Sequence, residues 1–207
     1  MNFKNLHTKK VILGSSSPRR KELLRDLGFE FKVINPSYEE NSEDDGYMPA
    51  KRVMLNAKGK LYSILQKIKE ENQDKDALII SADTIVHLGN EILEKPKSYD
   101  EAFSMLARLS GNTHKVHTGL FLFFTSKDGA TWQKYEEVIT EVQFKKLSED
   151  EIHTYLKLGE YKDKAGSYAI QGKGSYMVRS IKGSHSNVIG LPLCELSDIL
   201  NALEKEI

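Results

Sequence analysis

The segment GSSSPRR, residues 14–20, groups hydroxyl and guanidinium side chains at the start of an expected helix. A helix start offers free backbone N–H groups and the positive end of the helix dipole, and both favour phosphate. Ser15 and Ser17 add hydroxyl donors, while Arg19 and Arg20 add permanently charged, forked donors for phosphate oxygens. The alternative interpretation is an ordinary Ser-Pro helix cap followed by solvated arginines.

Asp83 is embedded in the apolar run of residues 78–88. An ionised carboxylate in such surroundings is costly unless it is paired, bound to a metal or open to a cleft. Asp83 is therefore a candidate general base or metal ligand near a phosphate. An aspartate that caps a turn or pairs with a lysine is the alternative.

Two lysines are candidates for neutralising phosphate charge. Pro96 restricts Lys95 to an extended backbone, which fixes the direction of its side chain. Lys58 lies beside the apolar stripe of an expected helix. Glu39 and Glu40, in an acidic loop, offer the oxygen ligands that Mg²⁺ or Mn²⁺ prefers beside phosphate. Solvated surface side chains are the alternative in each case.

The stretch of residues 163–172 carries the motifs DKAG and IQG. Its glycines permit close backbone approach to a ligand. The amide of Gln171 offers both a donor and an acceptor to the edge of a base. Two β-bulges or turns are the alternative interpretation.

Helix and strand patterns interleave along the whole chain, and serine N-caps begin three of the helices. Helices are expected at 18–27, 50–72, 98–111, 148–159 and from 193; strands at 11–14, 29–33, 77–88, 91–94, 116–125 and 133–144; an acidic loop at 36–46; and strand and loop at 165–192. This interleaving predicts the α/β class with a mixed sheet. Because no linker separates autonomous parts, residues 1–207 are expected to form a single domain.

The composition excludes several classes of protein. The 207 residues carry 30 Lys plus Arg against 30 Asp plus Glu, which predicts no basic nucleic-acid surface. No apolar run is long enough for a secretory signal or a membrane span, so a cytoplasmic protein without a membrane partner is expected. The single cysteine, Cys194, excludes an intramolecular disulfide, and its leucine neighbours favour a core thiol.

Taken together, these stretches resemble the Maf family of nucleotide pyrophosphatases. The matching segments occur in the family's order and span residues 11 to 193: LGSSSPRR (13–20), ADT (82–84), LEKP (93–96), LSG (109–111), DKAG to IQG (163–172) and SNVIGLP (186–192). Gly14 and Ser81 depart from the family, which usually has alanine and glycine at these two positions.

The resemblance implies a long twisted mixed sheet between two lobes with a central cleft. It also implies hydrolysis of a nucleoside triphosphate to the monophosphate and pyrophosphate with a divalent metal, Mg²⁺ or Mn²⁺, and suggests a homodimer. Asp83 matches the family's proton acceptor. The positions associated with phosphate or metal in the cleft are matched by Ser15, Arg20, Glu40, Lys58 and Lys95, with Glu40 as the expected metal ligand.

Three positions separate the branches of this family. Arg19, Thr84 and Gln171 resemble the branch that hydrolyses dTTP and UTP. The branch acting on 7-methyl-GTP is expected to carry tryptophan, glutamine and glutamate there. Two alternatives stay open: a nucleotide-binding regulator of cell division with little turnover, and a pyrophosphatase directed at purine nucleotides or 7-methyl-GTP.

Overall fold

Three long strands, β3 (Ala77–Leu88), β5 (Thr113–Thr125) and β6 (Thr131–Phe144), contribute residues to both compact units of the chain. The computed structural model describes residues 3–40, 48–70 and 75–207. The first unit comprises Met1–Asp83, Thr118–Val138 and Gly190–Ile207, and the second comprises Thr84–His117 and Ile139–Ile189. The single domain expected for residues 1–207 stays a prediction.

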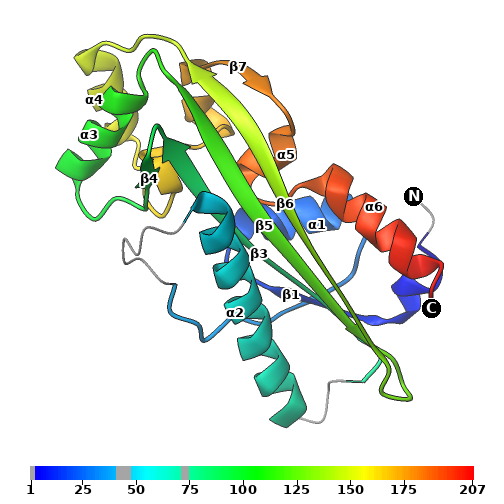
Figure 1. The fold of residues 1–207 in the computed structure, drawn as a ribbon. Helices are drawn as coiled ribbons and strands as arrows, with labels where there is room; N and C mark the ends of the chain where they lie inside the picture. Colours follow the sequence, from blue (N-terminus) through cyan, green and yellow to red (C-terminus); the bar gives the residue numbers. More distant parts are fainter. Residues whose placement is uncertain (1–2, 41–47, 71–74) are drawn as a thin grey trace. The chain divides into compact units, whose positions relative to one another are not determined.

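Figure 1 labels the helices and strands, and each remaining element lies within one of the two units. The first unit holds the 3₁₀ helix η1 (Leu6–Thr8), β1 (Lys10–Gly14), α1 (Pro18–Asp26), β2 (Lys32–Val33), α2 (Pro49–Glu70) and α6 (Leu193–Glu204). The second holds β4 (Glu91–Leu93), α3 (Tyr99–Leu109), α4 (Glu149–Lys157), the 3₁₀ helices η2 (Ala165–Ser167) and η3 (Gly172–Met177), β7 (Val178–Lys182) and α5 (His185–Ile189).

Among the described residues, seven strands form a mixed sheet in the order β2-β1-β3-β5-β6-β7, with β4 paired to β3. β1 runs parallel to both of its neighbours, whereas β4 and β7 pair antiparallel with β3 and β6. The predicted α/β class with a mixed sheet flanked by helices is confirmed.

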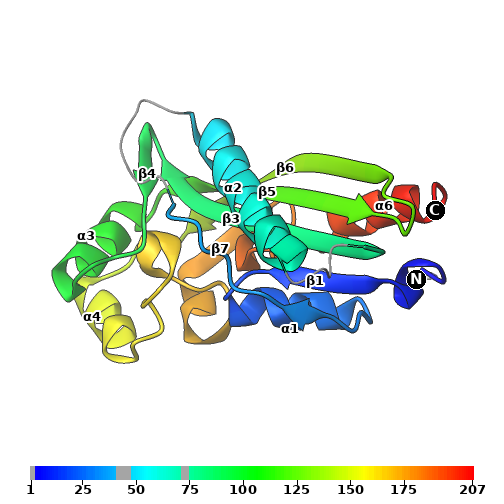
Figure 2. The same ribbon diagram turned by 90° about the horizontal axis from the view of Figure 1, so that it is seen from below.

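In the first unit, α2 and α1 lie on opposite faces of β1 and β3 (Figures 1 and 2). Strand side chains alternate between faces, so Ile12 of β1 and Ile79 of β3 both face α2. They meet a helical stripe on α2 that includes Ala57, Leu61 and Ile64. This apolar contact fixes which face of α2 meets the sheet.

A glycine on β5 sets how closely α2 approaches the sheet. A Cβ on Gly119 would lie 2.6 Å from the carbonyl oxygen of Val53 on α2, closer than real Cβ contacts come. Since that oxygen belongs to a helix backbone, it cannot swing aside as a side chain can. Any larger residue at this position therefore forces α2 away from β5.

In the second unit, a buried aromatic group joins β5 and β6 to the segment after η2. His114 Nε2 and the Tyr168 hydroxyl are 2.7 Å apart, and both rings pack at near right angles to Phe144. Burial lowers the pKa of His114 from 6.5 to about 4, so its imidazole is neutral at neutral pH.

The serine caps formed as predicted. The hydroxyl of Ser17 accepts a hydrogen bond from the Arg20 N–H at the start of α1. Ser148 and Glu151 complete a full capping box at the start of α4. At α3 the Ser98 cap is present, but the Glu101 carboxylate accepts from the N–H of Lys97, one residue earlier than a capping box requires.

Four expectations need correction or lie outside the described residues. The segment 165–192, expected to be strand and loop, also contains the short helices η2, η3 and α5. Only Lys32–Val33 of the strand expected at 29–33 pairs with β1, because the Phe29 ring stacks on Phe3 and His7 instead. Cys194 is exposed and is not a core thiol, because the buried positions of α6 begin two residues later at Leu196 and follow the other side of the helix. Residues 41–46 of the expected acidic loop lie outside the described residues.

No helix in the described part of the chain combines the length and the apolar character that a membrane crossing requires.

We expect Gly119→Ala to lower the free energy of unfolding by about 1–3 kcal/mol, because the added methyl group overpacks the α2–β5 contact. Urea unfolding at neutral pH measures the change. A variant as stable as the wild type would show that α2 shifts without cost.

His114 should make stability depend on pH. Below pH 6.5 the unfolded chain binds a proton at this residue, whereas the folded chain does so only near pH 4. The free energy of unfolding therefore falls as the pH decreases from 6.5 to 4, by about 3 kcal/mol at the lower limit.

His114→Gln keeps a polar group for Tyr168 and should remove this part of the pH dependence in urea unfolding. The exposed His185 serves as a control, and His185→Gln should leave the profile unchanged. If the free energy of unfolding changed equally with pH in wild type and in His114→Gln, the prediction would be wrong.

Candidate active site

The crossing of α2 over β3 brings three polar side chains together in the first unit. Residues 77, 79, 81 and 83 share one face of β3, since side chains alternate along a strand. At the crossing point, the Ser81 hydroxyl donates to the Ala57 carbonyl on α2 over 2.8 Å. Asp83 therefore points at the same helix, where Asn56 and Lys60 are four residues apart and lie on one face.

Asp83 is buried and doubly bound. Lys60 Nζ lies 2.5 Å from Asp83 Oδ1, and the Asn56 amide donates to Oδ2 over 3.0 Å. Burial alone would raise the pKa of the Asp83 carboxyl. The charge and hydrogen bond of Lys60, the Asn56 amide and the charge of Arg20 together outweigh burial and lower this pKa below its usual value. Asp83 is therefore ionised at neutral pH.

Lys60 also holds a second carboxylate. Its Nζ lies 2.6 Å from Oε1 of Glu40, whose side chain is 39% exposed. Tyr38 positions this part of the chain, because its hydroxyl donates to Asn56 Oδ1 over 3.4 Å. The Tyr38 ring lies so close to Gly59 that a Cβ there would meet it at 2.2 Å. The glycine between the two lysines thus lets the segment that carries Glu40 lie against α2.

The loop between β1 and α1 holds Ser15 and Arg20 in a fixed arrangement. The Ser15 hydroxyl oxygen accepts from the N–H of Ser17 and from Arg20 Nη1, each over 3.2 Å. Arg20 Nε donates to the carbonyl of Gly190 over 2.7 Å. These contacts lock the guanidinium of a buried arginine in place at the start of α1.

The charge of Arg20 is balanced by nearby carboxylates. Burial lowers the pKa of its guanidinium, and the charges of Asp83 and Glu40 act against that effect. An arginine stays protonated at any physiological pH. The cluster of Arg20, Lys60, Asp83 and Glu40 therefore combines two positive and two negative charges in one largely buried place.

Three predicted site residues, Arg20, Glu40 and Asp83, meet in this cluster, and Ser15 contacts it by accepting a hydrogen bond from Arg20. Lys58 does not join them. Its side chain is exposed, and its Nζ lies 5.7 Å from the centre of the Tyr62 ring. Two residues along a helix amount to about 200°, so Lys58 points away from the face that carries Lys60.

Sequence reasoning missed Asn56 and Lys60. The signal was available, because these polar residues flank Ala57 and Leu61 at the spacing of the buried stripe. Their pairing with a strand aspartate could not be read from the helix alone.

Four further residues were predicted for the site: Arg19, Thr84, Lys95 and Gln171. Arg19 is half-buried on α1 in the first unit. Thr84, Lys95 and Gln171 belong to the second unit, where Lys95 and Gln171 are exposed. Gln171 precedes η3 with an extended backbone.

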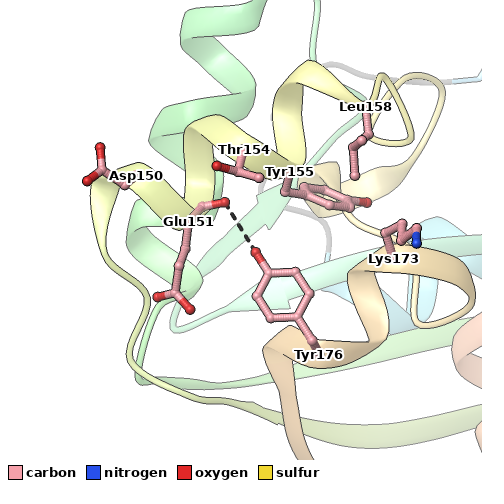
Figure 3. A pocket seen from close by; sticks show the side chains of 7 residues that line it. All are labelled: Asp150, Glu151, Thr154, Tyr155, Leu158, Lys173 and Tyr176. Atoms are coloured by element: carbon pink, nitrogen blue, oxygen red, sulfur yellow. Dashed lines mark hydrogen bonds between the residues drawn. The ribbon is translucent and has the colours of Figure 1, made fainter.

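A cavity of about 420 Å³ lies in the second unit between α4 and η3. Figure 3 shows its apolar wall of Tyr155, Leu158 and Tyr176, with the Tyr176 hydroxyl donating to the Glu151 carbonyl over 3.1 Å. None of the predicted site residues lines it. Its apolar wall lacks the convergent charges that a triphosphate needs.

Residues 10–203 match the protein family described as Maf-like protein. The chain belongs to the Maf family.

Curated members of the family are similar in sequence to this Maf chain. The dTTP/UTP pyrophosphatase of Thermoanaerobacter sp. (strain X514) is 46% identical over 191 residues, which cover 92% of this chain and 95% of that protein. The dTTP/UTP pyrophosphatase of Caldicellulosiruptor bescii is 43% identical over 94% of this chain and 95% of its own length. Among solved structures, a HAM1 protein from Coxiella burnetii covers 94% of this chain and 99% of its own, with 13% identity and a TM-score of 0.46.

The charged cluster of Arg20, Lys60, Asp83 and Glu40 contains ligands suited to a hard divalent cation, because Glu40 and Asp83 offer carboxylate oxygens. The described residues contain no group of three or more His, Cys, Asp or Glu side chains placed to hold a metal ion. Two protein carboxylates are enough for Mg²⁺, which commonly completes its coordination with substrate phosphates and water.

Proposed function

We propose that this Maf protein hydrolyses dTTP, UTP and related pyrimidine nucleoside triphosphates to the monophosphate and pyrophosphate. The observation that carries the proposal is the buried Asp83 carboxylate held by Lys60 and Asn56 within reach of the charge of Arg20. The relatives named dTTP/UTP pyrophosphatase, aligned over nine-tenths of the chain, support the substrate class.

The phosphates are bound, in this proposal, by Ser15, Arg20 and Lys60. Arg20 presents a guanidinium already fixed by Ser15 and Gly190, so little side-chain entropy is lost on binding. Lys60 replaces Lys58 in this role, because only Lys60 lies in the charged cluster.

Asp83 is proposed to accept the proton of the attacking water. The water oxygen bonds to the α-phosphorus, the bond from that phosphorus to the bridging oxygen breaks, and pyrophosphate leaves. Asp83 is ionised at neutral pH, but in the free protein its oxygen is bound to Lys60. A triphosphate that attracts the Lys60 ammonium frees Oδ1 for the metal, and Oδ2, which accepts one hydrogen bond from the Asn56 amide, takes the proton of the water.

Glu40 and Asp83 are the residues proposed to hold a divalent metal, Mg²⁺ or Mn²⁺. When bound, such a metal offsets negative charge on the phosphates and on the departing pyrophosphate. Arg20 and Lys60 offset the same charge from the protein side.

The second unit is proposed to supply the remaining contacts, on the strength of the sequence match. Lys95 would offset charge on the phosphates, and Gln171 would contact the pyrimidine. Arg19, from the first unit, and Thr84 would shape specificity. A homodimer and a cytoplasmic site of action, where nucleoside triphosphates are abundant, complete the proposal.

Asp83→Asn should lower kcat for UTP by about 10²–10⁴-fold, because the amide cannot accept the proton. Asparagine keeps the size and the hydrogen-bonding capacity of the side chain, so circular dichroism and thermal melting should still report a folded protein. A folded variant with near-wild-type turnover would remove Asp83 from the role of proton acceptor.

A substrate panel tests the function itself. We expect pyrophosphate release from dTTP and UTP, with Mg²⁺ or Mn²⁺, to exceed that from GTP and 7-methyl-GTP, and EDTA to abolish it. Preference for a purine nucleotide would favour the purine-directed alternative. Tight nucleotide binding without release, by folded protein with each metal, would favour the regulator of cell division.

A further inference from the structure

Lys60 stands between two carboxylates that the proposed function assigns to a metal. Its Nζ is 2.5 Å from Asp83 Oδ1 and 2.6 Å from Glu40 Oε1, and its side chain is only 8% exposed. A single ammonium thus binds one oxygen of each carboxylate at the same time.

An ammonium in this position competes with a divalent cation, because both need the same carboxylate oxygens. The charges of Asp83 and Glu40 are already cancelled by Lys60 and Arg20. A free Mn²⁺ or Mg²⁺ therefore meets a neutral cluster and must displace a buried cation to reach its ligands, which costs both an ion pair and desolvation.

We propose that Lys60 is a displaceable internal cation that keeps metal affinity low until nucleotide arrives. The inference rests on the proposed function, since it takes Glu40 and Asp83 as metal ligands and a triphosphate as substrate. Phosphate oxygens draw the Lys60 ammonium from the two carboxylates, and the freed oxygens then accept the metal. Metal and nucleotide binding are consequently coupled, and each increases affinity for the other.

The neighbouring residues support this assignment. Asn56 binds the other oxygen of Asp83, and Tyr38 binds Asn56, so the carboxylate stays in place when Lys60 leaves. Lys60 has a long, flexible side chain, so its ammonium can swing towards phosphate while its Cα stays on α2. Arg20, held by Ser15 and Gly190, is not free to make the same exchange.

The test measures Mn²⁺ binding without nucleotide, from the electron paramagnetic resonance signal of free Mn²⁺. Three proteins are compared: wild type, Lys60→Met, and the matched control Lys58→Met on the opposite side of the same helix. We expect millimolar or weaker binding to wild type and to Lys58→Met, and binding at least about ten-fold tighter to Lys60→Met, because removal of the ammonium leaves uncompensated carboxylates.

Equal Mn²⁺ affinities for folded Lys60→Met and wild type would overturn the inference. Lys60→Gln provides a second, polar variant if the methionine protein does not fold. The Mn²⁺ affinity of the wild type is a second test by itself. Micromolar Mn²⁺ binding to the wild type without nucleotide would contradict the proposal that the Lys60 ammonium blocks the two carboxylates.

These outcomes are independent of turnover. A positive substrate panel together with equal Mn²⁺ affinities would reject the role of Lys60 and leave the proposed function standing. A negative panel with tighter Mn²⁺ binding to Lys60→Met would reject the function and leave the metal competition in place.

Discussion

The close crossing of α2 over β3 is the constraint on which the charged cluster depends. Asp83 lies on a strand and its two partners lie on a helix, so no local interaction brings them together. The crossing is fixed by an apolar stripe on α2, by the hydrogen bond from Ser81 to the Ala57 carbonyl, and by the absence of a side chain at Gly119. Ser81 is one of the two departures from the family pattern, and here its hydroxyl joins strand to helix.

Burial gives this cluster its chemical properties and makes its members interdependent. Each charge in it would be costly alone, and each is stabilised by an opposite charge or a fixed hydrogen bond. The balance of two positive and two negative groups lets the Maf chain keep them buried without a ligand. An anion or cation bound as proposed would have to rearrange the existing pairs and would thereby change the basicity of Asp83.

Periodicity and capping signals predicted most of the fold because they depend on neighbouring residues. The helices at α1, α3 and α4 begin at the serines that cap them, and β3 follows the apolar run that contains Asp83. The strand at β2 was predicted too long and Cys194 was predicted to be buried, because both outcomes depend on which surface each residue faces in the fold. Lys58 and Lys60 illustrate the same limit: both lie near the apolar stripe, and only the packed orientation of α2 tells them apart.

Ser15, Arg20 and Asp83 were predicted from an ordered set of short motifs, which carries information that single-residue reasoning lacks, whereas Glu40 lies outside those motifs. Asn56 and Lys60 lie outside these motifs, so the structure was needed to show that they contact Asp83. Motifs identify residues that lie close together in the sequence. Packing identifies residues, such as Asn56 and Lys60, whose contacts form only when helix and strand come together.

The hydrogen bond from Arg20 to Gly190 joins residues 170 positions apart. In the same unit, the Glu204 carboxylate of α6 accepts from the backbone N–H groups of Asn5 and Leu6. During synthesis from the N-terminus, the loop after β1 is made early. Arg20 can be fixed only after Gly190 has been made, which requires almost the whole chain. A nascent Maf chain, or one truncated before Gly190, therefore lacks the partner that fixes Arg20, so the arrangement proposed to bind phosphate forms only when synthesis is nearly complete.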